Sequence, residues 1–129
     1  MHIEHFAIWT KDLERLRRFY ERYFNAVAGA KYVNEKRGFA SCFLAFECGA
    51  RLELMTIAGV TDAVSAGDAP VAGYAHLAMA LGSTTHVDEL TNALRSDGYP
   101  IIGEPRWTGD GYYESVVLDP DGNQIELTV

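Results

Sequence analysis

The chain has 129 residues, of which 48% are apolar, and a formal net charge of −7 at pH 7. This length suits one ordinary hydrophobic core, or two small modules that share one, and the composition is that of a folded protein. The negative charge argues against nucleic acid and anionic membrane surfaces as partners, because both attract basic proteins.

The sequence favours the cytoplasm. No apolar run approaches the roughly 20 residues of a membrane-spanning helix, and the N-terminus has no basic segment followed by an apolar one. Cys42 and Cys48 fit that compartment as free thiols, because a strand that rises about 3.3 Å per residue would hold their sulfur atoms too far apart to bond. A bend after Glu47 would weaken this argument.

The first half of the chain has the pattern of a strand, a helix and three further strands. Thr10 or Asp12 is placed to cap the helix, and Gly29 is the expected stop after it. Apolar residues recur at helical spacing in between, so one face of this helix should be buried. The expected strands are residues 2–9, 31–33, 39–46 and 51–57.

The second half repeats this order, with Ser83 or Thr84 as helix cap and Gly98 as helix stop. Its expected strands are residues 74–81, 101–104, 112–118 and 124–129. We therefore expect an α+β fold built from two βαβββ modules in one domain. The expected boundaries are module 1 at about 1–58, a linker at about 59–72 and module 2 at about 73–129, within a single domain of residues 1–129.

Each half carries one histidine and one glutamate at matching positions. His5 and His76 each belong to the opening strand of their module, and Glu53 and Glu126 each follow a glycine in the pattern Gly-x-x-x-Glu-Leu. Side chains alternate along a strand, so each glutamate should point away from the apolar residues that flank it. Each module thus has one apolar face for its helix and one mixed face with a histidine and a glutamate.

Two imidazoles and two carboxylates form a suitable site for a divalent metal ion such as zinc, nickel, cobalt, manganese or iron. A glutamate that loosens from the ion can take a proton from a substrate carbon, while the metal stabilises the enediolate oxygen. A single histidine or glutamate on a half-exposed strand is usually just solvated. The prediction therefore depends on all four residues occupying repeat positions.

Other polar groups have simpler interpretations. His2 should point to the opposite strand face from His5, and His86 should be solvated in the first turn of its helix. Residues 119–123 lack the full ligand spacing of a calcium loop and are expected to form a turn. Residues 109–111 are likewise expected to form a hairpin turn and not a phosphate-binding loop.

These motifs together resemble the vicinal oxygen chelate superfamily over essentially the whole chain, and the order His, Glu, His, Glu is similar to glyoxalase I. The C-terminal motif is the most specific part of the likeness. The motifs are the opening histidine strand followed by Asp12-Leu13, the helix with Phe19-Tyr20, Leu52-Glu53-Leu54, residues 73–78 and residues 119–127.

The resemblance implies that the two modules pair edge to edge into an open, barrel-like sheet around a metal ion, with zinc or nickel foremost and cobalt, manganese or iron as alternatives. It also implies a homodimer, in which one site can take a histidine–glutamate pair from each subunit. Glu126 would be the main proton-transfer base and Glu53 its partner. The implied activity is that of a lactoylglutathione lyase-like enzyme, which isomerises a small carbonyl compound or its thiol hemithioacetal through an enediolate.

One position departs from the glyoxalase I pattern. Trp9 stands where those enzymes usually carry an arginine that serves the carboxylate of the thiol. Arg51, on the same strand face as Glu53, is a candidate substitute. The candidates for an apolar substrate pocket are Trp9, Tyr112, Tyr113 and Trp107. Metal chemistry is therefore better supported than glutathione as cosubstrate, and both the substrate and the thiol stay open.

Two alternatives belong to other functional classes of the same superfamily. One is a non-catalytic resistance protein that binds an antibiotic or metabolite, and it predicts no stoichiometric metal. The other is a fosfomycin-type thiol transferase, which needs only three of the four ligands.

Overall fold

The computed structural model describes residues 1–62 and 72–129, which belong to two compact units, Met1–Val64 and Ser65–Val129. Residues 63–71, most of the predicted linker, lie outside the described residues. Within the described part, no helix is both long enough and apolar enough to cross a membrane.

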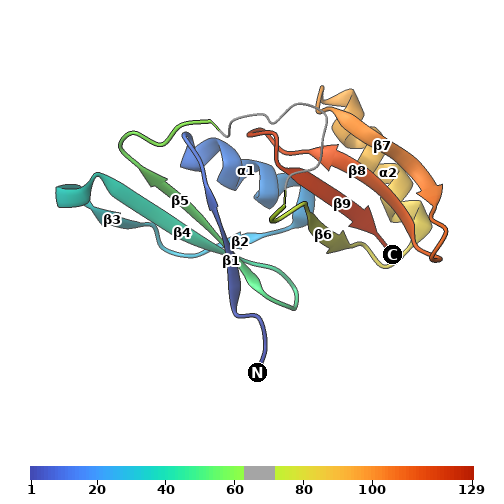
Figure 1. The fold of residues 1–129 in the computed structure, drawn as a ribbon, viewed down its shortest axis with the longest axis horizontal. Coiled ribbons are helices and arrows are strands. Elements are labelled where there is room, and N and C mark those ends of the chain that lie inside the picture. The colour runs from blue at the N-terminus through green and yellow to red at the C-terminus, as the bar shows by residue number, and fades with distance from the viewer. Residues whose placement is uncertain (63–71) are drawn as a thin grey trace. The chain divides into compact units, whose positions relative to one another are not determined.

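The first unit is a mixed β-sheet with one α-helix (Figure 1). In chain order its elements are β1 (His5–Trp9), α1 (Leu13–Phe24), β2 (Val27–Ala28), β3 (Tyr32–Asn34), the 3₁₀ helix η1 (Glu35–Arg37), β4 (Phe39–Ala45) and β5 (Arg51–Ile57). The sheet order is β1-β5-β4-β2, and β3 also pairs with β4. β1 runs parallel to β5, whereas the other pairs are antiparallel.

Polar residues cap both ends of helix α1. Asp12 is the N-cap, and its carboxylate accepts a hydrogen bond from the backbone N–H of Arg15 at 2.9 Å. The helix ends at Asn25, which adopts the left-handed conformation with a φ of 52°. The predicted stop at Gly29 is wrong, because asparagine also tolerates this conformation and the chain has already entered β2 before Gly29.

The core of the first unit lies between α1 and the strands β4 and β5. Leu16 and Tyr20 of the helix are fully buried, as is Leu44 of β4. Leu52 and Leu54 are buried on the helix-facing side of β5. Alternation along β5 therefore points Glu53, between these two leucines, to the other face of the sheet, as predicted.

The second unit repeats the arrangement with a second helix and sheet (Figure 1). Its elements are β6 (Leu77–Ala80), α2 (Thr84–Ser96), β7 (Ile101–Trp107), β8 (Tyr113–Leu118) and β9 (Gln124–Thr128). The sheet order is β6-β9-β8-β7, with β6 parallel to β9 and the other pairs antiparallel. Both units thus place the opening strand beside the closing strand, in parallel.

Helix α2 packs its buried side chains against β8 and β9. Ser83 is the N-cap, and its hydroxyl accepts a hydrogen bond from the backbone N–H of His86 at 3.2 Å. Buried Thr91 donates to the carbonyl of Val87 at 2.6 Å, and its hydroxyl lies 2.7 Å from that of Ser115 on β8. The helix and the sheet therefore satisfy each other's buried hydroxyls.

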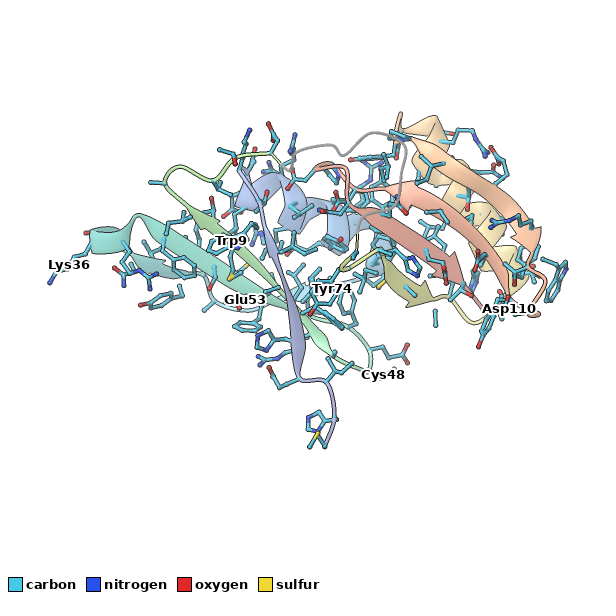
Figure 2. The ribbon with its side chains drawn as sticks, viewed as in Figure 1. Trp9, Lys36, Cys48, Glu53, Tyr74 and Asp110 are labelled. Carbon is cyan, nitrogen blue, oxygen red and sulfur yellow. The ribbon has the colours of Figure 1, made fainter. Side chains whose placement is uncertain are left out.

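The predicted turns are confirmed, whereas several of the predicted element bounds differ from those in the structure. Residues 109–111 turn the chain between β7 and β8, where Figure 2 labels Asp110, and residues 119–123 turn it between β8 and β9. The strands predicted for residues 2–9 and 74–81 begin only at His5 and Leu77, respectively. The short β2 was not predicted, and β7 runs on to Trp107 with register shifts around Gly103. The α+β class and the two βαβββ modules are confirmed, while the edge-to-edge pairing of the modules and the single-domain organisation stay predictions.

Candidate functional site

The first histidine–glutamate pair lies on the sheet face that α1 leaves open. Ala7 of β1 is the register partner of Glu53 on β5, and His5 stands two residues before Ala7. Because side chains alternate, His5 and Glu53 therefore point to the same face of two adjacent strands. Nε2 of His5 lies 3.8 Å from Oε2 of Glu53. Figure 2 labels Glu53 on β5.

The second pair has the same construction. Ala78 of β6 is the register partner of Glu126 on β9, and His76 stands two residues before Ala78, just ahead of the strand. Nε2 of His76 lies 3.3 Å from Oε2 of Glu126. Buried Ile125 and Leu127 flank Glu126 and face α2, so the glutamate points to the opposite side of the sheet.

The two pairs also have matching environments. The side chains of His5 and His76 are 38% and 41% exposed, whereas those of Glu53 and Glu126 are 16% and 18% exposed. In both units, then, a largely shielded carboxylate faces a more accessible imidazole. This repeated geometry is the strongest indication of function in the described residues.

The spacing within each pair fits two ligands of one metal ion. Ligand atoms about 2.1 Å from a zinc ion lie roughly 3 to 3.5 Å from each other in a regular site. The second pair, at 3.3 Å, has this separation, and the first, at 3.8 Å, is slightly wider. Among residues 1–62 and 72–129, no group of three or more histidine, cysteine, aspartate or glutamate side chains is placed to hold an ion, and each pair contains two side chains of these types.

The first pair has additional polar neighbours. Nδ1 of His5 is in hydrogen-bonding contact with the carboxylate of Glu4, and the guanidinium of Arg51 contacts the same carboxylate. These hydrogen bonds, that from His5 foremost, lower the pKa of Glu4. The guanidinium of Arg51 also lies over the ring of Phe43, 4.2 Å from its centre.

Sequence reasoning missed Glu4 and Phe43. A carboxylate directly before a candidate ligand histidine was the available signal for Glu4. Phe43 is the register partner of Glu53 on β4, a relationship that only the strand pairing reveals. Arg51, predicted to bind substrate, shares the face of Glu53 as expected, but its contacts are to Glu4 and Phe43.

Trp9 lies on the same open face as the first pair, at the end of β1 (Figure 2). It is the register partner of Met55 and is half exposed. Its ring meets that of Phe39 edge-on, with centroids 6.2 Å apart, and Phe39 contacts Tyr32 at the same distance. These three rings form an apolar surface beyond the carboxylate of Glu53.

The other aromatic candidates are placed differently. The hydroxyl of Tyr113 donates to Asp88 on α2 at 2.7 Å, and this bond raises the pKa of Tyr113. Tyr113 therefore lies on the helix side of its sheet, opposite Glu126, and Trp107 packs against its ring at 5.3 Å. Tyr112 is exposed directly before the same strand. The structure thus brings Tyr113 to α2 and not to the face of the second pair.

Three further polar groups from the sequence analysis lie outside the two histidine–glutamate pairs. The ring of His86 contacts the carbonyl of Leu81 at 3.0 Å, and His2 lies exposed ahead of β1. Asp119 is buried in its turn and accepts bonds from the backbone of Asp121 and from both the backbone and the side chain of Asn123, each at 2.8 to 2.9 Å. Burial raises the pKa of Asp119, and these bonds oppose the shift.

The two cysteines are free, as predicted. Cys42 is buried in β4, and its burial raises the pKa of the thiol, whereas Cys48 is exposed in the turn before β5 (Figure 2). Neither belongs to a histidine–glutamate pair.

The family model of the Glyoxalase/Bleomycin resistance protein/Dioxygenase superfamily matches residues 2–127. The chain belongs to this superfamily. The match confirms the resemblance inferred from the motifs, and it covers both histidine–glutamate pairs. No curated protein matches the chain in sequence. Because the superfamily contains both enzymes and resistance proteins that bind their ligand, membership alone leaves the activity to be argued from the site.

Solved structures of this superfamily resemble the chain closely in fold. Glyoxalase I of Leishmania major, described as trypanothione-dependent, is 27% identical with a TM-score of 0.78, and the match covers 99% of this chain and 86% of that one. Glyoxalase I of Zea mays is 24% identical with a TM-score of 0.78 over 98% of this chain, which spans only 44% of the Zea mays chain. A glyoxylase/bleomycin resistance protein/dioxygenase domain from Frankia sp. EAN1pec is 16% identical with a TM-score of 0.82, covering 100% and 97%. Below 25% identity the likeness is one of fold alone.

Proposed function

We propose that this protein is a metal-dependent lyase or isomerase of the glyoxalase I type, which acts on a small carbonyl compound or its hemithioacetal with a thiol. The observation that carries the proposal is the repeated histidine–glutamate pair, with Nε2 to Oε2 distances of 3.8 and 3.3 Å in the two units. The 27% identity to a trypanothione-dependent glyoxalase I supports the choice of reaction class.

The proposed metal ligands are His5, Glu53, His76 and Glu126. A centre of four ligands needs both pairs, since each pair supplies two; they come either from one chain or from the two subunits of a homodimer. Imidazole and carboxylate ligands suit zinc or nickel foremost, then cobalt, manganese or iron. Free thiols accord with a cytoplasmic location.

In the proposed reaction, Glu126 takes a proton from the substrate carbon next to the carbonyl group and returns it to the neighbouring carbon. One C–H bond breaks and another forms, so the isomerisation through an enediolate needs no oxidant or reductant. Glu53 is the second carboxylate that holds or returns the proton. A divalent cation bound by the two pairs supplies positive charge for the substrate oxygens. Both carboxylates are more than four-fifths shielded from solvent, which suits proton transfer to carbon.

The proposed substrate surface is apolar near the first pair. Trp9 and Phe39 present their rings on the open face, and the guanidinium of Arg51 is held by Glu4 and Phe43. We therefore assign Trp9 to contact with an apolar part of the substrate or thiol, and Tyr112, exposed in the second unit, to a similar role. This arrangement does not single out glutathione as the thiol.

The test is an assay of zinc- and nickel-loaded protein with methylglyoxal and several thiols. Glu126→Gln should lower turnover by about 100-fold or more, as expected on loss of a general base. Glu104→Gln is the control, because Glu104 is an exposed carboxylate on β7 that pairs with Arg95. Unchanged turnover in Glu126→Gln would show that the base is assigned wrongly.

Elemental analysis of protein purified without added metal separates this proposal from the other classes. A resistance protein that only sequesters its ligand predicts no stoichiometric metal. A thiol transferase with three ligands predicts that Glu53→Gln keeps its activity, whereas the proposed enzyme should lose most of it.

A further inference from the structure

The carboxylate of Glu4 connects two residues on the open face of the first unit. Its Oε2 contacts Nδ1 of His5, and its Oε1 contacts the guanidinium of Arg51. The backbone reinforces the arrangement, because the N–H of Arg51 donates to the carbonyl of Glu4 at 3.0 Å. Glu4 therefore contacts the first residue of β1, His5, and the first residue of β5, Arg51.

The ring of Phe43 also contacts both His5 and Arg51. The guanidinium of Arg51 lies 4.2 Å from the centre of the Phe43 ring, and the ring of His5 meets Phe43 edge-on at 5.3 Å. A guanidinium over an aromatic face is stabilised by the ring quadrupole. The imidazole of His5 is therefore oriented by a carboxylate on one ring nitrogen and by an aromatic ring at its edge.

The contact with Glu4 determines which ring nitrogen of His5 carries the proton. An ionised carboxylate only accepts hydrogen bonds, so Nδ1 must be the donor. In the neutral imidazole, Nε2 then has a lone pair, and this is the atom that faces the Glu53 carboxylate at 3.8 Å. Two acceptors that face each other favour a cation between them.

We propose that Glu4, held in place by Arg51, is a positioning residue that keeps His5 in its Nδ1-protonated form and directs the Nε2 lone pair toward the metal. The inference rests on the proposed metal centre and adds to it the reason for the orientation of His5. It also makes the two pairs unequal. Among the described residues, no carboxylate contacts Nδ1 of His76, and its Nε2 faces Oε2 of Glu126 at 3.3 Å.

The expected effect lies in metal affinity and not in folding. Carboxylates that hold a ligand histidine typically contribute about 10- to 100-fold to metal affinity. The side chains of Glu4 and Arg51 are 53% and 43% exposed, and exposed ion pairs stabilise a fold very little. Glu4→Ala should therefore fold normally and bind zinc about 10-fold more weakly.

The first experiment observes the imidazole nitrogens of the metal-free full chain by ¹⁵N NMR at about pH 8, above the ordinary pKa of histidine. In the wild-type protein His5 should be protonated on Nδ1, and in Glu4→Ala it should shift toward the Nε2-protonated form. His76 and His86 are controls in the same spectrum and should not change. An Nε2-protonated or doubly protonated His5 in the wild type, or nitrogen shifts unaltered by Glu4→Ala, would overturn the proposal.

The second experiment measures zinc affinity by competition with a chelating dye. Glu4→Ala should weaken binding, while Glu104→Ala, which removes an exposed carboxylate paired with Arg95, should not. Arg51→Gln should weaken binding in the wild-type background but add nothing in Glu4→Ala, because Arg51 acts through Glu4. If Arg51→Gln reduced zinc affinity by the same factor in the wild-type protein and in Glu4→Ala, Arg51 would not act through Glu4.

The two experiments distinguish this inference from the proposed function. If the wild-type protein bound no stoichiometric zinc, the proposed function would fail, but the NMR measurement on metal-free protein would still decide the role of Glu4. If the wild-type protein bound one zinc ion per site and Glu4→Ala bound zinc as tightly, the positioning role of Glu4 would be wrong, and the proposed function would be unaffected.

Discussion

Nε2 of His76 lies 3.3 Å from Oε2 of Glu126, and the same two atom types face each other at 3.8 Å in the first unit. In both units the histidine stands two residues before the alanine that pairs with the glutamate. A repeated register of this kind sets the opening strand of each unit beside the strand that carries the glutamate, which explains how a histidine and a glutamate so distant in the chain come to form a pair.

His76→Ala should weaken zinc binding by at least about 100-fold, because a direct ligand contributes more than the 10- to 100-fold typical of its outer partners. His86→Ala is the matched control, since His86 belongs to the same unit but directs its ring to the carbonyl of Leu81. Competition titrations with a chelating dye measure both. Equal affinity of the two variants would remove His76 from the metal centre.

Zinc should stabilise the wild-type protein, because an ion that binds only the folded chain adds free energy of unfolding. At a free concentration about 100 times the dissociation constant, the gain is about 2.7 kcal/mol. Thermal unfolding with zinc and with a chelator should therefore give clearly different melting temperatures. Glu53→Gln should lose most of this difference, whereas Glu104→Gln should keep it. If the melting temperature of the wild-type protein were the same with zinc and with a chelator, the result would argue against a bound metal ion.

Tyr113→Phe should leave the KM and kcat of any measured turnover nearly unchanged, because its hydroxyl donates to Asp88 on α2 and lies on the helix side of the sheet. The variant should lose a small part of its stability with that hydrogen bond. Trp9→Ala should instead raise KM, because it removes an aromatic ring from the open face of the first unit. Steady-state kinetics and urea unfolding of the two variants together test this assignment.

The stability that Asp119 contributes should depend on pH. Burial raises its pKa in the folded protein, so the folded state holds this proton more tightly than the unfolded state. The corresponding stabilisation is fully present below the unfolded pKa and is lost as the pH rises through the folded value. Relative to Asp119→Asn, the wild-type protein should therefore gain stability as the pH falls from 7 toward about 4. Urea unfolding of both proteins at the two pH values measures the difference, and the opposite trend would contradict the shift.

Local patterns predicted much of the fold. Asp12 and Ser83 cap the two helices as expected, since a cap depends only on the next few backbone N–H groups. The end of α1 was missed, because Asn25 and Gly29 are both able to end a helix and their local sequence does not choose between them. Tyr113 was a candidate for a substrate pocket, and its strand neighbours do not reveal the hydrogen bond that its hydroxyl donates to Asp88 on α2.

The sequence by itself determined which side chains share a face. The two-residue period of a strand sends Glu53 and Glu126 away from their buried neighbours whatever the strands pair with. Only the tertiary structure decided which strands are adjacent and in what register. The parallel pairing of β1 with β5 sets Ala7 opposite Glu53, and with it His5 near Glu53 and Glu4 near Arg51. Such pairing joins segments far apart in the chain, and no local pattern specifies it.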